Sequence, residues 1–474
     1  MPRVHWADWS DQYGRGFAPY RLMRGLLSVL PLLLLALIFC RRRGIKAFLI
    51  FTSVFFLPFR TDFLLMGGGV GESNWTDGLY ITFSEVSLLL LFAHLFFSNQ
   101  KIRRIAISDL VPPIALVAAC ALSIVNSTWR IASVYQIIML SLTAFLYFGI
   151  LSKSLTTPDD IDILLIAFMA SLTFQSALSI LQYTVGNTFD FFSTGQSQWG
   201  GGPNLWGRGF GTVINRPNGF AALINPLLFL SVSILLGTER HRKLALVASV
   251  MGFLGLAASF SRGAWIGFAI GSIILVTMLY KDGLLDTARL WKVLAVGALT
   301  LALLFPYLRA RIVDDFMNSA MVSRIPLMIA ALRMVKGHPI MGVGVNTFRS
   351  IIRSYVGGLD VFYLDETHNQ YLLMVSEAGI LGLAGWLWTM GRIFKNSASC
   401  FRDGRDRVTK YIGLGILTGF LSSSLHMFFD MYNSQVLLAN MFVLLSLVAA
   451  CNALGRVSLP GEQEWGSRIA IHAR

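Results

Sequence analysis

The sequence predicts an all-α polytopic membrane protein, with about twelve transmembrane helices in a single membrane domain that spans residues 1–474. Two observations predict this fold class. Of the 474 residues, 55% are hydrophobic and only 14% are charged, whereas soluble proteins carry about 25% charged residues. In addition, apolar runs long enough to cross about 30 Å of hydrocarbon recur along almost the whole chain.

The apolar runs are separated by loops that are alternately rich and poor in lysine and arginine. Their approximate bounds are residues 45–59, 79–98, 108–125, 131–151, 161–185, 219–237, 244–260, 264–280, 291–308, 371–390, 411–429 and 435–453. Because cationic loops stay on the cytoplasmic side, both termini are predicted inside and two loops outside, residues 186–218 and 309–370. One more run, residues 25–40, is short and is followed at once by three arginines. If it crosses fully, the chain has thirteen spans.

The net charge is +14, from 39 Lys+Arg against 25 Asp+Glu. This topology explains the cationic inner loops, but not the arginines in the two outer loops. Cationic loops contact anionic lipid, so we expect membrane lipids and no nucleic acid as partners. The cysteines lie at wide spacings in or beside apolar runs, without the pairing typical of a metal site or a disulfide framework. They are Cys40, Cys120, Cys400 and Cys451. We therefore expect no metal site, no disulfide and no cofactor.

The long outer loop contains a short helical pattern. Between Ile325 and Val335, apolar residues recur at helical spacing, which predicts short amphipathic helices. Glycines and a proline that follow at residues 337–344 end the pattern.

Four polar residues that are far apart in the sequence are all predicted at the outer face: Arg216, Arg262, Arg324 and His368. Arginine presents a planar fork of donors suited to phosphate oxygens, and a neutral histidine can remove a proton from a hydroxyl. Together they would suit transfer from a lipid-linked diphosphate. The alternative for each arginine is a side chain at a helix end that reaches the lipid headgroups.

The residues around His368 also have structural interpretations. Thr367 and Gln370 fit a capping box that starts the next helix. The glycines at 379, 382 and 385 lie near one helical face, where small residues permit close packing. Glu377 is buried by position, either as a partner within the helix bundle or as a group that supports the base.

The order of short motifs in residues 210–385 resembles the O-antigen ligase superfamily, which includes polysaccharide polymerases and bacterial O-oligosaccharyltransferases. The motifs are, in chain order, Gly211-Thr212 with Arg216-Pro217-Asn218, then Ser261-Arg262-Gly263, then Gly337-His338-Pro339 with Gly342 and Gly344, and finally His368-Asn369 with Gly379 and Gly382. The rest of the chain matches only in its hydropathy.

The resemblance implies a metal-independent, inverting glycosyltransferase with a GT-C-type fold in a bacterial inner (cytoplasmic) membrane. It would move a glycan from an undecaprenyl-diphosphate-linked donor to an acceptor hydroxyl at the periplasmic face. His368 matches the base, Arg216 and Arg262 match the diphosphate-binding arginines, and Arg324 matches less closely. Three further residues are candidates for groups that support these site residues from outside the site: Asn369, Glu377 and His338.

Several activities share these motifs. A ligase would act on lipid A-core or another surface acceptor, whereas an O-antigen or exopolysaccharide polymerase would use a lipid-linked glycan as its acceptor. An O-oligosaccharyltransferase would use a protein. A lipid-linked glycan transporter is the alternative from another class, although such proteins often contain internal repeats, and this sequence shows no long repeat.

Overall fold

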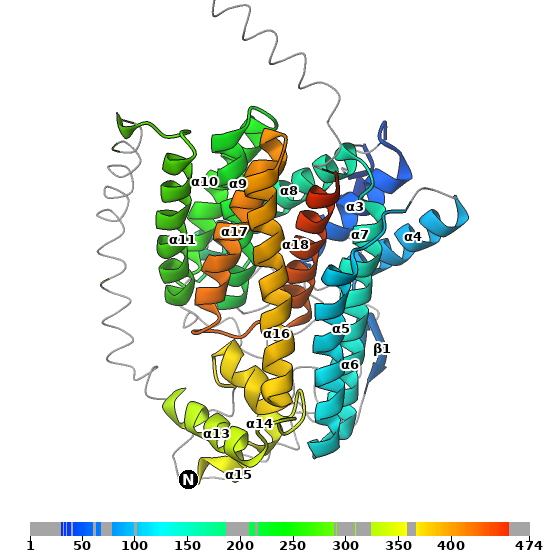
Figure 1. Ribbon diagram of the computed structural model, residues 1–474, viewed down its shortest axis with the longest axis vertical. Coiled ribbons are helices and arrows are strands. Elements are labelled where there is room, and N and C mark those ends of the chain that lie inside the picture. Colours follow the sequence, from blue (N-terminus) through cyan, green and yellow to red (C-terminus); the bar gives the residue numbers. More distant parts are fainter. Residues whose placement is uncertain are drawn as a thin grey trace, which may run out of the picture.

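The computed structural model describes residues 41–59, 63–67, 78–98, 102–185, 208–213, 217–288, 324–357 and 366–454, with scattered positions among residues 30–38 and residues 291 and 309. Long helices form an upright bundle, and three short helices lie at its lower end (Figure 1). The fold class is therefore all-α and polytopic, as the sequence predicts.

Within the described residues, eleven of the predicted spans contain a helix, and seven helices are long and apolar enough to cross a membrane. The predicted span 291–308 and the run 25–40 lie mostly outside the described residues, so the predicted number of twelve stays a prediction. The long helices are α5 (Ile107–Leu122), α6 (Arg130–Thr143) continued by the π-helix Ala144–Ile150 and α7 (Leu151–Ser154), α8 (Pro158–Val185), α9 (Pro217–Gly237), α10 (Arg242–Ala258), α11 (Arg262–Lys281), α16 (Gln370–Asp403), α17 (Arg407–His426) and α18 (Gln435–Leu454).

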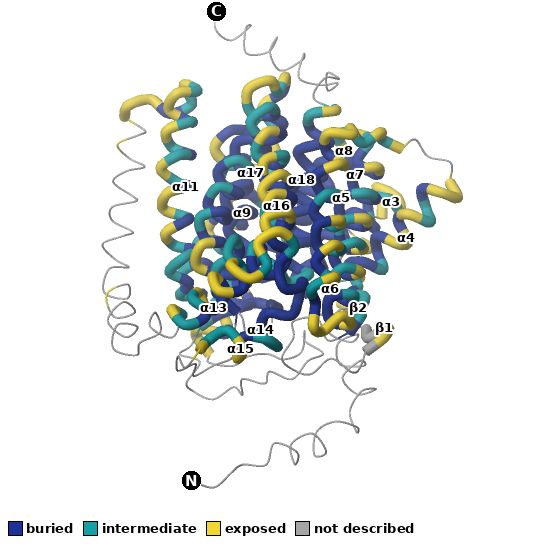
Figure 2. Tube along the Cα trace, turned by 60° about the horizontal axis from the view of Figure 1, so that its bottom comes forward, coloured by how far each residue is buried: buried dark blue, intermediate teal, exposed yellow. Residues whose placement is uncertain are grey.

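Helix α18 lies at the centre of the bundle and α11 at its edge (Figure 2). The most apolar window of α18 is 89% buried, against 28% for α11. Both helices are apolar, so sequence alone does not distinguish them. The exposed apolar side chains of α11 face outward, where lipid would surround the bundle.

Two of the predicted spans contain only short helices. Helices α3 (Gly44–Phe55) and α4 (Phe83–Phe97) have 12 and 15 residues, or about 18 and 22 Å at 1.5 Å per residue. Between them β1 (Phe63–Gly67) pairs antiparallel with β2 (Gly78–Ile81), a hairpin that the sequence analysis did not predict. Each helix is therefore shorter than the hydrocarbon thickness.

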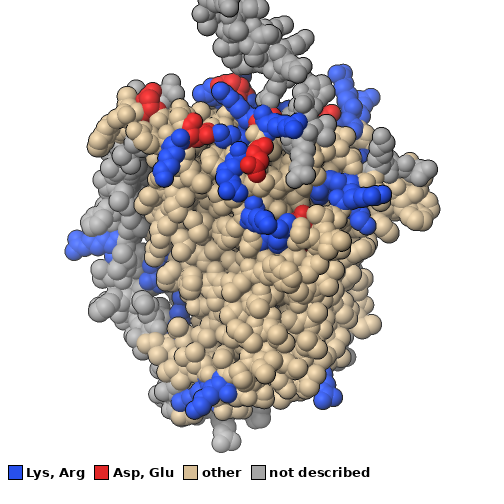
Figure 3. Space-filling view, in the orientation of Figure 1, with Lys and Arg blue, Asp and Glu red and all other residues tan. Residues whose placement is uncertain are grey.

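Charged side chains gather at one end of the bundle, the upper end in Figure 3. We call this the charged end and define it by its ion pairs. They are Lys46–Asp160, Arg240–Asp162, Arg392–Asp109 and Lys410–Asp282. A broad band without charged side chains covers the middle of the molecule in this view.

The opposite end carries α13 (Arg324–Gly337), α14 (Phe348–Ile351) and α15 (Arg353–Val356), which confirms the short helices predicted in the long loop. We call this the site end. Its loop packs on a break in α16, where Gly379 has φ +67° and ψ −170°. The amides of Val343 and Gly344 donate to the carbonyls of Ser376 and Glu377, at 3.0 and 2.9 Å.

Gly379 permits close packing as predicted, but against this loop rather than against another helix, and it interrupts α16, which the sequence did not predict. A Cβ atom there would lie 2.0 Å from the Ile340 carbonyl oxygen. Gly385 does behave as predicted: it lies against Leu116 of α5, whose Cα would be 2.8 Å from an added Cβ. The loop that fills the break also contacts the start of α6, where Ser133 donates to the Val345 carbonyl at 2.7 Å.

Candidate functional site

His368 stands in a tight turn just before α16. Its φ is +50°, an uncommon conformation for a residue other than glycine. The hydroxyl of Thr367 donates to the Asn369 carbonyl at 2.8 Å and accepts from the Asn369 amide at 3.2 Å, which closes the turn around His368. The turn holds the imidazole on a fixed backbone rather than on a mobile loop tip.

The predicted capping box of Thr367 and Gln370 is wrong. Asn369 is the N-cap of α16, and its side chain accepts from the Leu372 amide at 3.0 Å. Thr367 cannot fill this role because its hydroxyl closes the turn around His368. Gln370 instead accepts from the Tyr432 amide at 2.7 Å, which joins α16 to the loop of residues 427–434.

That loop brings Asp430 to His368. The Nδ1 atom of His368 lies 3.7 Å from Oδ1 of Asp430, an ion-pair contact longer than a hydrogen bond, and Asp430 is only 7% exposed. Burial alone would raise the pKa of Asp430, but the pairing with His368, the nearby His426 and the Met431 amide stabilise the charged form. The pKa therefore lies below its ordinary value.

Asp430 orients the imidazole ring of His368. A carboxylate beside Nδ1 favours the tautomer with the proton on that nitrogen, which leaves the Nε2 lone pair available to accept one. The same carboxylate would stabilise the imidazolium that forms. The arrangement can therefore do general-base chemistry.

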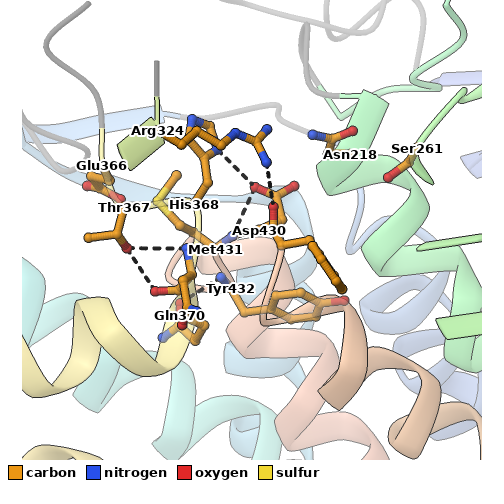
Figure 4. A network of polar contacts seen from close by, with 12 residues as sticks. Asn218, Ser261, Arg324, Glu366, Thr367, His368, Gln370, Asp430, Met431 and Tyr432 are labelled. Carbon is orange, nitrogen blue, oxygen red and sulfur yellow. Dashed lines mark hydrogen bonds and ion pairs between the residues drawn. The ribbon is translucent and has the colours of Figure 1, made fainter. Parts of the chain in front are cut away.

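Arg324 is the first residue of α13 and donates to the Phe429 carbonyl at 3.4 Å, next to Asp430. Figure 4 shows Arg324, His368 and Asp430 converging from three separate segments, with Asn218 and Ser261 to one side. The structure thus brings two of the predicted site residues, Arg324 and His368, together.

Arg262 is the first residue of α11 and follows Ser261, whose Oγ lies 3.4 Å from Nε2 of His426. His426 ends α17, directly before the loop that carries Asp430. Arg262 therefore belongs to the same corner of the bundle, on the side of Ser261. Arg216 lies outside the described residues, and its place stays a prediction.

Glu377 and His338 lie elsewhere, at the break in α16. Oε1 of Glu377 accepts from the amides of Thr347 and Phe348 at 3.0 and 2.9 Å, so it caps the start of α14. His338 begins the turn after α13, and its carbonyl accepts from the Gly342 amide at 3.0 Å. These two residues build the joint between the short helices and α16 and do not lie beside the imidazole of His368.

Sequence reasoning missed three residues of this corner: Asp430, His426 and Arg208. Arg208 donates to the Ser259 carbonyl and to Oδ1 of Asn218, both at 2.8 Å, and so ties the start of α9 to the α10–α11 turn. The signal for the first two was a histidine and an aspartate in the turn before the last span. For Arg208 the sequence shows only a following glycine, Gly209. In the structure a Cβ on Gly209 would lie 2.1 Å from the Ser179 hydroxyl.

Residues 247–387 match the family model described as O-antigen ligase. This match confirms the predicted resemblance to that superfamily over these residues and supports a membrane glycosyltransferase-like function. The matched region includes α11 with Arg262, α13 with Arg324, and His368 at the start of α16. A search of the curated proteins found no match.

Proposed function

From the O-antigen ligase match of residues 247–387, we propose that the protein transfers a glycan from an undecaprenyl-diphosphate carrier to an acceptor hydroxyl, as a ligase. One observation carries this proposal: the buried carboxylate of Asp430 faces His368 where Arg324 and the Ser261–Arg262 turn converge. A base and phosphate-binding cations are the groups that this reaction needs.

In the proposed step, Nε2 of His368 removes the proton from the acceptor hydroxyl. The oxygen attacks the anomeric carbon as the bond from that carbon to the diphosphate oxygen breaks. Undecaprenyl diphosphate leaves, and its added negative charge is stabilised by Arg262, Arg216 and Arg324. A single displacement inverts the anomeric centre. Because guanidinium groups supply the positive charge, the reaction requires no metal ion.

The proposed orientation rests on the two ends of the bundle. The charged end would face the cytoplasm of a bacterium, because lysine and arginine are enriched in cytoplasmic loops. The site end, with His368, would then face the periplasm or exterior of the inner membrane, where lipid-linked glycans are presented. A GT-C-type fold agrees with a reaction centre at the membrane surface rather than at its midplane.

A polymerase is the second candidate, and one observation favours it. Residues 324–357 contain five lysines and arginines and no aspartate or glutamate: Arg324, Arg333, Lys336, Arg349 and Arg353. Such a segment could bind the diphosphate of a second lipid-linked glycan, which a polymerase needs as its acceptor.

The test is His368→Asn in the native host. Asparagine tolerates the positive φ of this turn but cannot act as the base, and loss of a general base lowers the rate about 10²- to 10⁴-fold. The measurement is the chain length of the lipid-linked glycan that accumulates. Long polymers with loss of the finished conjugate indicate a ligase, and single repeat units indicate a polymerase.

The matched control is His241→Asn, at another histidine with positive φ (+55°) at the charged end. It should leave the surface glycan unchanged. If His368→Asn behaves in the same way as this control, His368 is not the base and the proposal fails.

A further inference from the structure

A second histidine connects the two sides of the site. His426 is only 1% exposed, so it is too deeply buried to contact a substrate. Its Nε2 lies 3.4 Å from the Ser261 hydroxyl and its Nδ1 lies 3.1 Å from the Tyr432 hydroxyl. In a neutral imidazole one nitrogen donates and the other accepts, so both contacts can be hydrogen bonds at the same time.

On one side, His426 contacts the turn that starts α11. Ser261 is the N-cap of α11, yet its side chain does not cap the helix. It points to His426 instead. The next glycine allows this approach, since a Cβ on Gly263 would lie 2.8 Å from Cδ2 of His426 and 2.7 Å from Cβ of Phe429. The backbone that carries Arg262 therefore rests on His426.

On the other side, His426 contacts the loop that holds Asp430. Tyr432 presents its hydroxyl to His426 and its amide to Gln370 at the start of α16. The His426 carbonyl also accepts from the Asp430 amide at 3.1 Å. A shift of His426 would thus change the position of Asp430, and with it the direction of the His368 imidazole.

We propose that His426 is a positioning residue. Through side-chain contacts with Ser261 and Tyr432, it fixes the diphosphate-binding turn at Arg262 relative to the His368–Asp430 pair. This inference rests on the proposed function, because it assigns a diphosphate to Arg262 and a base to His368. His426 and Ser261 are 165 residues apart in the sequence.

Two variants separate the two contacts. His426→Asn keeps a polar atom near the place of Nδ1 and so keeps the contact with Tyr432, whereas His426→Gln keeps one near Nε2 and so keeps the contact with Ser261. We expect His426→Asn to weaken the binding of undecaprenyl diphosphate about 10-fold. We expect His426→Gln to leave this binding unchanged and to slow glycan transfer about 10-fold.

Binding is measured with undecaprenyl diphosphate and the purified full-length protein in lipid nanodiscs. Transfer is measured in the native host, as finished conjugate per amount of folded protein. Ser261→Ala and Tyr432→Phe repeat the test with smaller changes that leave the imidazole in place, and should follow His426→Asn and His426→Gln respectively. His241→Asn is the control for the histidine-to-asparagine change.

The outcomes are distinguishable. If the unmodified protein does not bind undecaprenyl diphosphate, the proposed function itself fails. If it binds, but Ser261→Ala and Tyr432→Phe both retain normal binding and normal transfer, the positioning role is wrong. A purely structural role is shown if all four variants lower the amount of folded protein and change binding and transfer alike.

Discussion

The two ends of the bundle use their cations differently. At the charged end, Lys46 pairs with Asp160 at 2.8 Å, and Arg392 pairs with Asp109. At the site end, Arg208, Arg324 and Arg333 donate to carbonyl or amide oxygens. An ion pair joins two charged side chains, whereas a carbonyl or amide oxygen fixes the direction of a guanidinium.

This difference indicates what each end is built for. Paired charges at one end fasten helix to helix and need no further partner. Under the proposed function, the arginines beside His368 and Asp430 at the other end bind the oxygens of an anionic diphosphate. Substitutions at the site end should therefore change transfer, and those at the charged end should change stability alone.

The largest effect is expected at the break in α16, which supports the site end. In Gly379→Ala the new Cβ would lie 2.0 Å from the Ile340 carbonyl oxygen, on a residue with φ +67°. A clash with backbone at a strained position should lower the free energy of unfolding by more than about 3 kcal/mol. Thermal unfolding in detergent measures this loss.

Gly391 on the same helix is the matched control, because nothing lies within 4 Å of an added Cβ. Gly391→Ala should leave stability unchanged or raise it by up to about 1 kcal/mol. Equal stability of Gly379→Ala and Gly391→Ala would contradict the break in α16 at Gly379.

The next largest effect is expected at Arg262, and it concerns transfer. Arg262→Gln removes a cation that the proposal assigns to the leaving diphosphate, which should lower the transfer rate about 100-fold, or about 2.7 kcal/mol. The rate of conjugate formation in the native host is the measurement. Arg405→Gln, in the loop after α16 at the charged end, should transfer normally, and an equal loss in both variants would mean that net charge matters rather than the site.

Asp430→Asn tests the site end through the pH dependence of stability. It should slow transfer about 10- to 30-fold, or about 1.4 to 2 kcal/mol, because the amide cannot stabilise an imidazolium. Since the pKa of Asp430 is lowered in the folded protein, its ionised form stabilises the fold above its ordinary pKa. That contribution is lost as the pH falls to the lowered value.

Thermal unfolding of the unmodified protein and of Asp430→Asn over a pH series checks this. The difference in stability should be greatest near neutral pH and should shrink under acidic conditions. A difference that grows with acidity has the wrong sign for a lowered pKa.

The smallest effect is expected for Lys410→Met at the charged end, where Lys410 pairs with Asp282. Both side chains are partly exposed, so the loss should be no more than about 1 kcal/mol of stability. Conjugate formation should be unchanged, and a strong loss of transfer would break the division between the two ends.

The sequence by itself determined the membrane class and the positions of most described helices, and it singled out His368 as a candidate base, because each depends on local information. Apolar run length sets where helices form, and a histidine and arginines in a polar loop beside an apolar run are visible directly. The superfamily resemblance also follows from short motifs in a fixed order.

Only the tertiary structure decided which groups meet. Asp430, His426 and Arg208 reach the site through contacts between distant segments, and a span pattern carries no information on such contacts. The same holds for Gly379, whose positive φ depends on the loop that docks on it, and for Thr367, which closes a turn instead of capping a helix. Local sequence patterns cannot show these contacts, because the hydrogen-bonding groups of one segment find their partners on another segment that is distant in the sequence.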